Sequence, residues 1–131
     1  MSWQAYIDDS LVGSGHIDKG SIVSLAGDST WATTPGFSVG ADELTNVIIP
    51  ILNGKEEARD KAYADGLYVA GERFVLTKVE GSIYARQGKK GVCIAKTTQA
   101  IIIGHHHEDA QAGNVTQTVE ALKDYLVKLG Y

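Results

Sequence analysis

DAQAGNVTQTVEALKDYLVKLGY, residues 109–131, is the most regular stretch of the sequence. Its apolar residues are spaced four, three, four and three apart, which places them on one face of an α-helix. The members of this stripe are Val115, Val119, Leu122, Leu126 and Leu129. Asp109 or Asn114 can cap the first turn, and Gly130 can end the helix. We therefore predict a long amphipathic helix whose apolar stripe faces the core.

Two aromatic residues of this stretch do not fit a plain core stripe. Tyr125 lies about 60° from Leu122 around the helix, on the shoulder of the stripe. Tyr131 ends the sequence, and chain ends usually fray and carry nothing bulky. Aromatic residues at such places are either without a role or half of a binding surface.

The composition is that of an ordinary globular protein. The 131 residues, 44% of them hydrophobic and 21% charged, are enough for one domain over residues 1–131 with a core of its own. No apolar run approaches the roughly 20 residues that span a bilayer, and the polar, acidic N-terminus predicts no signal peptide. Cys93 is the only cysteine, so no internal disulfide is possible, and we expect a buried strand residue in a reducing compartment.

The net charge of −4 is unevenly distributed along the chain. Residues 72–96 hold six basic and two acidic residues, a net +4, and the remainder of the chain is net −8. Such a basic segment on an acidic protein indicates an acidic partner or an anionic lipid headgroup. The alternative is a solvated strand face with lysines that guard an edge.

Before residue 66 the pattern predicts helices and one hairpin. Residues 2–11 read as a short helix, and residues 40–52 and 55–64 as two more. Between them, residues 16–25 and 29–33 read as strands joined by a tight turn at Gly27-Asp28.

From residue 66 onward the pattern predicts strands alone, until the last helix. Residues 67–69, 73–79, 82–86, 91–96 and 99–104 are short and β-rich, with connections that force antiparallel neighbours. In the second of these strands, Phe74, Leu76 and Lys78 should share one face. We predict an α+β fold: one central antiparallel sheet, with the N- and C-terminal helices side by side on one face and two short helices on the other.

Four separated motifs resemble the profilin family. They are MSWQAY at residues 1–6, GDSTWA at 27–32, SIYARQGKKG at 82–91 and VEALKDYL at 119–126. The resemblance runs from end to end of the chain and is closest to the shorter plant, fungal and protist profilins. It implies a cytoplasmic protein of the cytoskeleton and cell cortex that regulates actin polymerisation. The implied ligands are monomeric actin in a one-to-one complex, proline-rich proteins such as formins, and polyphosphoinositides, with no nucleic acid and no cofactor.

A proline-rich ligand also makes physical sense of the aromatic residues. A polyproline II helix has no backbone donors and exposes carbonyls and flat rings. Its receptor must therefore be a shelf of aromatic side chains that carry N–H or O–H donors. By resemblance, the groove consists of Trp3, Tyr6, Trp31, Tyr125, Leu126 and Tyr131. Tyr125 stands where animal profilins have histidine, and because the ring is kept we expect binding to survive.

The actin and lipid sites rest on the resemblance. Profilins meet actin with the strands after the helix pair and the start of the last helix, which implies Arg73, Lys78, Arg86, Lys90, Gly113, Thr116 and Gln117. Thr116 stands where many profilins have asparagine, and Gln111 where animal ones have histidine; either departure could reduce affinity. The basic side chains Lys78, Arg86, Lys89 and Lys90 are expected to hold a polyphosphoinositide headgroup by charge-assisted hydrogen bonds.

Other motifs are weaker. Three consecutive histidines, His105-His106-His107, suggest a metal, but neighbours on an extended chain point to opposite sides, so we expect no metal site and a solvated turn that leads into the last helix. The loop 88–91 lacks the pattern of a phosphate loop. No nucleophile and base pair stands out, so we predict no enzyme. The alternative function is a sensor-type or scaffold α+β domain that binds a small molecule in its interior, which would place the aromatic residues inside a pocket.

Overall fold

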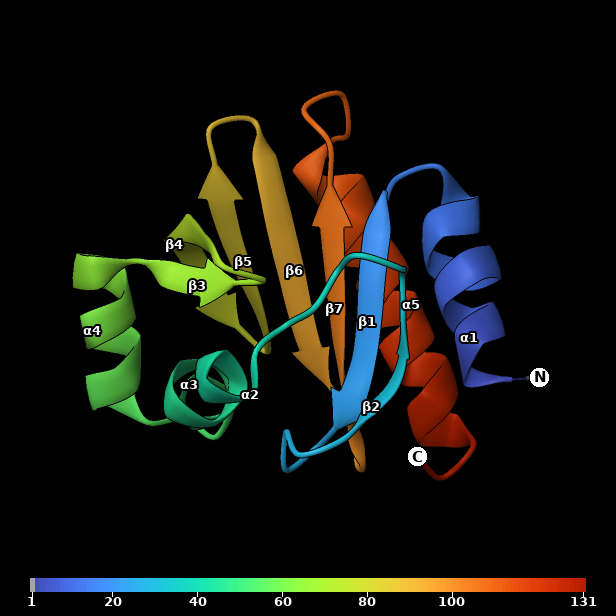
Figure 1. Ribbon diagram of the computed structural model, residues 1–131, viewed down its shortest axis with the longest axis horizontal. Coiled ribbons are helices and arrows are strands. Elements are labelled where there is room, and N and C mark those ends of the chain that lie inside the picture. The colour runs from blue at the N-terminus through green and yellow to red at the C-terminus, as the bar shows by residue number, and fades with distance from the viewer. Residues whose placement is uncertain (1) are drawn as a thin grey trace.

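The computed structural model describes residues 2–131, so that Met1 of the first motif lies outside the described residues. A single antiparallel sheet has the strand order β2-β1-β7-β6-β5-β4-β3 (Figure 1). The strands are β1 (Lys19–Ser24), β2 (Thr30–Thr33), β3 (Leu67–Val69), β4 (Glu72–Glu80), β5 (Ser82–Gln87), β6 (Lys90–Lys96) and β7 (Ala100–His106).

The order of the strands follows from the short connections. Strands β3 to β6 each pair with the next strand along the chain, because tight turns such as those at Gly81 and Gly88 leave room only for an antiparallel neighbour. The β1–β2 hairpin then joins at the free edge of β7, where Ile22 lies opposite Ile102. The predicted meander and hairpin are confirmed, and the hairpin completes the sheet.

The helices lie at the two ends of the chain and between β2 and β3. They are α1 (Trp3–Ala5), η1 (Tyr6–Leu11), η2 (Val12–Ser14), α2 (Ala41–Glu43), η3 (Leu44–Ile48), α3 (Ile49–Leu52), α4 (Glu56–Asp65) and α5 (Ala112–Lys128). The first three make one continuous N-terminal helix, capped by the Ser2 hydroxyl, which accepts from the Ala5 N–H at 3.2 Å. Its middle part, η1, is wound as a wider π-helix.

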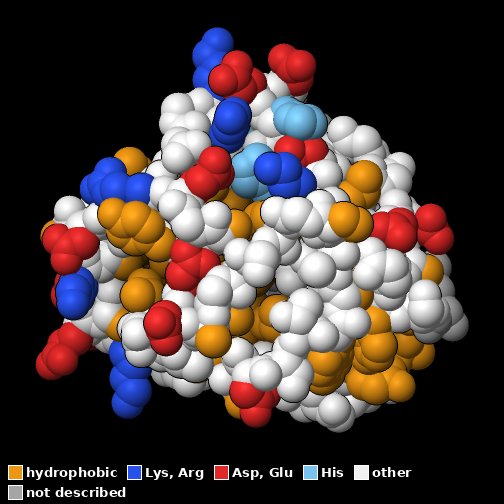
Figure 2. All heavy atoms as spheres, viewed as in Figure 1, with side chains coloured by type: hydrophobic (Ala, Val, Ile, Leu, Met, Phe, Trp, Pro, Cys, Tyr) orange, Lys and Arg blue, Asp and Glu red, His pale blue; other side chains and the backbone are white. Residues whose placement is uncertain are grey.

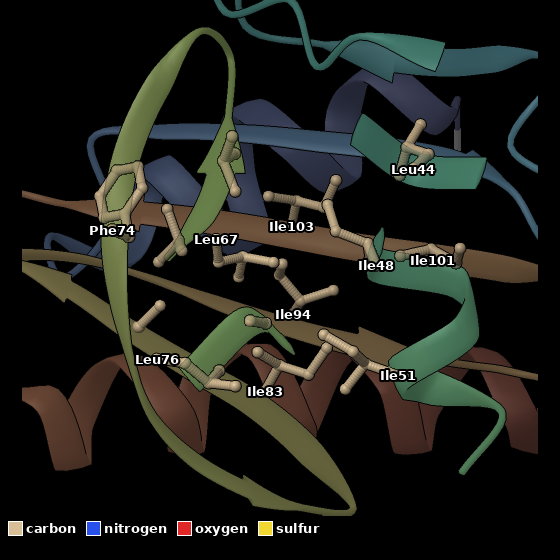
Figure 3. Close-up of a cluster of buried hydrophobic side chains, with 14 of the residues drawn as sticks. Leu44, Ile48, Ile51, Leu67, Phe74, Leu76, Ile83, Ile94, Ile101 and Ile103 are labelled. Atoms are coloured by element: carbon tan, nitrogen blue, oxygen red, sulfur yellow. The ribbon is translucent and has the colours of Figure 1, made fainter. Parts of the chain in front are cut away.

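The sheet separates two hydrophobic cores, as the predicted layers require. On one face, the N-terminal helix and α5 lie side by side and bury Ile7, Leu11 and Val119 against the sheet (Figure 1). On the other, η3, α3 and α4 pack over β3, β4 and the inner strands (Figure 3). Strand β7 serves both cores by alternation, with Ile101 and Ile103 on the α3 side and Ile102 on the α5 side.

Strand β4 departs from the predicted alternation at a β-bulge. The pairing with β5 shifts between Leu76 and Lys78, so that Thr77 is the extra residue. Phe74 and Leu76 share the buried face, but Lys78, which was predicted on the same face, is exposed. Beyond the bulge Val79 packs against the core instead. The bulge therefore turns Lys78 out of the core.

The ends of α5 also differ from the prediction. Gln111 occupies the N-cap position without a side-chain hydrogen bond, so neither Asp109 nor Asn114 is the cap. Leu129 follows the last helical residue, and its side chain is 49% exposed and outside the apolar stripe. The other four members of the stripe are buried. Gly130 has a positive φ of 94°, which ends the helix.

The histidine run is not a solvated turn, and this expectation is wrong for two of its three members. His105 and His106 are the last residues of β7 and are 4% and 1% exposed. The strand simply continues two residues past Gly104, and alternation sends the two rings to opposite faces. The His105 ring packs near Phe37 and Phe74, with Nδ1 2.6 Å from Asp18. Only His107 is exposed.

Two further expectations concern the cysteine and membrane-spanning segments. Cys93 is fully buried in β6, as predicted. Among residues 2–131 no helix combines the length and the apolar character needed to cross a membrane.

Candidate functional site

Five aromatic side chains from four segments meet at one end of the molecule. This aromatic cluster consists of Trp3, Tyr6, Trp31, Tyr125 and Tyr131. The Trp3 ring centroid lies 4.7 Å from that of Trp31, 5.0 Å from that of Tyr131 and 5.6 Å from that of Tyr6. Tyr6 in turn lies 6.1 Å from Tyr125. Figure 2 shows hydrophobic side chains gathered at the lower right, where β2 and the ends of the two terminal helices lie in Figure 1.

The helices and strand that carry these rings are held to one another by packing and by a hydrogen bond. Trp3 is on α1, Trp31 on β2 and Tyr125 on α5. The Gln4 side chain ties α1 to β2, because its Nε2 donates to the Thr33 carbonyl at 3.0 Å. Leu126, which the resemblance assigned to the groove, is fully buried in the core beneath the cluster. Its side chain therefore supports the aromatic rings from the inside.

The tyrosine hydroxyls of the cluster are suited to donate hydrogen bonds. Burial raises the pKa of Tyr6, and the neighbouring Tyr125 raises it further. The Tyr6 hydroxyl thus keeps its proton throughout the neutral range. Tyr125 is half exposed, so that its ring and hydroxyl are open to a ligand.

A groove continues from the cluster between the two terminal helices. It has a volume of about 530 Å³, and Tyr6 and Tyr125 form its wall on the side of the cluster. Its remaining lining residues are Ser10, Gln117, Thr118, Ala121 and Leu122. The sequence analysis did not assign Ser10, Thr118 or Ala121 to a binding site. Their spacing along the two helices could have indicated that they lie on the sides that face each other.

A second hollow lies between β4, β5 and the start of α5. This strand hollow has a volume of about 520 Å³ and brings together five of the seven residues that the resemblance assigned to actin. These five are Lys78, Arg86, Gly113, Thr116 and Gln117. The bulge at Thr77 is what turns Lys78 toward α5. Glu80 and Glu120 also line the hollow, and Glu80 Oε2 lies 3.4 Å from Lys78 Nζ in an exposed ion pair.

The other predicted basic residues do not line the strand hollow. Arg73 lies along Gly66 on the β3 side, where its Nε donates to the Asp65 carbonyl at 2.9 Å. Lys89 and Lys90 are at the tip of the β5–β6 hairpin. Of the four residues expected to bind lipid, Lys78 and Arg86 therefore share the hollow, and Lys89 and Lys90 share the hairpin tip.

Tyr84, which the sequence analysis did not assign to a site, lines the strand hollow and contacts His106 behind it. Tyr84 lines it from β5, and its hydroxyl lies 2.7 Å from His106 Nε2. Burial raises the pKa of Tyr84 and lowers the pKa of His106. The alternation of side chains along β7 would have indicated a buried His106 if the predicted strand had continued past Gly104.

Two of the three histidines of the run lie against one aspartate. Asp18 contacts both His105 and His107, with Oδ2 3.3 Å from His107 Nδ1. Among the residues that the structure describes, no group of three histidine, cysteine, aspartate or glutamate side chains is placed to hold a metal ion.

Comparisons with known proteins identify relatives of this chain over its whole length. The family model "Profilin" matches residues 1–131. The profilin of Saccharomyces cerevisiae is 39% identical over 132 residues, which cover all of both chains. The crystal structure of Schizosaccharomyces pombe profilin superimposes with a TM-score of 0.89 at 36% identity and covers 99% of this chain and 100% of that one.

A more distant likeness concerns the fold alone. Mouse profilin IIa, in complex with a double repeat from the FH1 domain of mDia1, has a TM-score of 0.80 at 20% identity, with all of both chains covered. The same α+β arrangement is thus kept at low identity. Because the family model and a relative at 39% identity both cover the whole sequence, this chain belongs to the profilin family.

Proposed function

We propose that this profilin binds monomeric actin one to one and links it to proline-rich ligands such as formins, and so regulates actin polymerisation. The proposal includes a single domain over residues 1–131, no catalytic activity, and work in the cytoplasm at the cytoskeleton and cell cortex. The observation that carries it is the aromatic cluster, which brings together both tryptophans of the chain, each of them half-buried.

The cluster has the chemistry that a polyproline II helix requires. Its rings offer flat apolar faces, and the tryptophan N–H and tyrosine O–H groups offer donors to the ligand carbonyls. The rings come from the two terminal helices, β2 and Tyr131, and two of them border an open groove between the helices rather than an interior cavity, which argues against the small-molecule sensor. Mouse profilin IIa binds an FH1 repeat in this fold, which supports a proline-rich ligand for this chain as well.

A polyproline titration followed by tryptophan emission tests this function. Both tryptophans lie in the cluster, so emission should change on binding without background from elsewhere. A peptide of about ten prolines spans roughly 31 Å, enough to cross the rings of two adjacent helices. No change at millimolar proline, in a protein shown by circular dichroism to be folded, would refute the proline-binding function.

The strand hollow supports the actin surface. Lys78 and Arg86 face the start of α5 across it, and Val75, 54% exposed on β4, lies opposite Arg86 in the sheet. An exposed apolar residue beside basic side chains suits the centre and rim of an interface with an acidic partner. Arg73 and Lys90 are proposed as outer contacts of the same surface.

The lipid site is proposed on Lys78, Arg86, Lys89 and Lys90. Each basic residue near an anionic membrane contributes on the order of 1 kcal/mol, so four give reversible attachment only. Because Lys78 and Arg86 also line the strand hollow, polyphosphoinositide vesicles and actin should compete. A stable ternary complex on vesicles, seen by co-sedimentation, would contradict that overlap.

A further inference from the structure

The last two residues of the sequence are held by the turn between β6 and β7. The Thr97 hydroxyl donates to the main-chain oxygen of Tyr131 at 2.7 Å, and the Gln99 backbone N–H donates to the same oxygen. The Gln99 side-chain amide donates to the Gly130 carbonyl at 3.1 Å. Tyr131 also gives its own N–H to the Leu126 carbonyl at 2.9 Å. Gly130 and Tyr131 are thus hydrogen-bonded both to the β6–β7 turn and to the last turn of α5.

Thr97 is built for this contact. Its side chain is buried, and its oxygen accepts from the Ala100 N–H at 2.9 Å, which fixes the direction of the hydroxyl. The hydroxyl has one proton, and the Tyr131 oxygen at 2.7 Å is nearer than the Ala100 carbonyl at 3.4 Å. The proton therefore goes to Tyr131.

The anchored backbone delivers the Tyr131 ring to the aromatic cluster. That ring meets Trp3 edge-on, with an interplanar angle of 80° and a centroid distance of 5.0 Å. Trp3 is also the ring that contacts Tyr6 and Trp31. Without the turn, the free ligand-binding surface would have to order Tyr131 at the moment of binding.

We propose that Thr97 and Gln99 are positioning residues of the proline-binding groove, which hold the Tyr131 ring in place before a ligand arrives. They do not touch the ligand; they remove the ordering cost of one aromatic side chain. This inference rests on the proposed proline-binding function. It adds a segment, the β6–β7 turn, that neither the resemblance nor the aromatic pattern assigns to the groove.

The test is a double-mutant cycle by polyproline titration. Thr97→Val and Gln99→Ala together should weaken polyproline binding about three- to tenfold, as expected for one immobilised side chain. In a Tyr131→Ala background the same two changes should alter affinity by less than about twofold, because no ring remains to be positioned. Thr97→Ser, made in place of Thr97→Val, should leave the affinity for polyproline unchanged, since it keeps the hydroxyl. Thr98→Val is the matched control, because Thr98 is exposed one residue along the same turn.

Equal loss in both backgrounds would mean a general defect of the fold and would overturn the proposal, as would unchanged affinity in the presence of Tyr131. The backbone heteronuclear NOE of Tyr131 gives a readout without ligand. It should report a rigid amide in the unchanged protein and a less restricted one in the double variant, which keeps only the main-chain bonds of Tyr131 to Gln99 and Leu126. A protein that shows this rigid amide but binds no polyproline refutes the proposed function and leaves the anchor intact; a mobile amide in the unchanged protein refutes the anchor itself.

Discussion

The rings of Tyr84 and His106 stack almost in parallel, with planes 9° apart and centroids 5.9 Å apart. His106 Nδ1 lies 2.7 Å from the His107 carbonyl, which can only accept, so Nδ1 carries the proton of the neutral ring. Nε2 then accepts from the Tyr84 hydroxyl. Gly91 leaves room for both groups, because a Cβ there would lie 2.5 Å from His106 Nε2. The pair is thus arranged for an uncharged imidazole.

This arrangement predicts a pH-dependent stability. Burial, assisted by His105 and Arg86, lowers the pKa of His106 in the folded protein. As the pH falls below the ordinary histidine value of about 6.5, the unfolded chain binds the proton first, and the free energy of unfolding should decrease. For one proton the slope is at most about 1.4 kcal/mol per pH unit. Urea unfolding between pH 5 and 8, followed by circular dichroism, measures it.

His106→Gln should be less stable overall but should lack this contribution to the slope. His16→Gln is the matched control, because it makes the same substitution at a partly buried histidine outside the Tyr84–His106 pair. An identical slope in the unchanged protein and in His106→Gln would show that another group titrates.

The periodicity of the sequence predicts the core elements well. A helix packed on a sheet must bury one apolar stripe, and the spacing of the apolar residues predicts which one. The buried residues of this stripe are Val115, Val119, Leu122 and Leu126. The error at Leu129 has a local cause: Gly130 ends the helix, so the stripe stops one turn early. Helix ends depend on the surrounding loops, which a periodic pattern does not describe.

The site was predicted less evenly. The aromatic cluster followed from residue type and resemblance, because Trp3 and Trp31 stand in separate motifs that the fold brings to one edge. The position of Lys78 in the strand hollow could not be predicted, because it depends on the bulge at Thr77, and the bulge depends on the pairing of β4 with β5. Thr97 and Gln99 act through main-chain oxygens, and a main-chain partner leaves no pattern in the sequence.

The Cys93 thiol should be inert in the folded protein. Burial raises its pKa to about 11, because the thiolate would lie in the core between β6 and α5. At pH 8 only about one molecule in a thousand would carry a thiolate, and the reagent has no access. Labelling with a thiol reagent such as DTNB should be slow in buffer and complete in denaturing urea. Rapid stoichiometric labelling of the native protein would contradict this burial.

Charge reversal should locate the actin surface. Arg86→Glu places an acidic group in the strand hollow and should weaken actin binding markedly, with a weaker salt dependence, because the attraction is screened over about 10 Å at 0.1 M salt. Lys89→Glu makes the same charge change at the hairpin tip and is the matched control. A polymerisation-delay assay with purified actin measures both. Equal effects of the two variants would mean long-range steering without a local contact.

Substitution of Trp3 tests the centre of the aromatic cluster. Trp3 contacts three of the other four rings, so Trp3→Ala removes both a ligand face and the support of its neighbours. Polyproline affinity should fall by about 2 kcal/mol, or roughly thirtyfold, as at an interface hot spot. The signal remains measurable because Trp31 is still present as a fluorophore in the cluster.

Actin binding provides the control for the same variant. The strand hollow contains no member of the aromatic cluster, so Trp3→Ala should delay actin polymerisation as the unchanged protein does. Tyr63→Ala removes an exposed aromatic ring on α4, away from the cluster, and should leave both activities as they are. If Trp3→Ala and Tyr63→Ala bound polyproline equally well, the cluster would not be the proline-binding site.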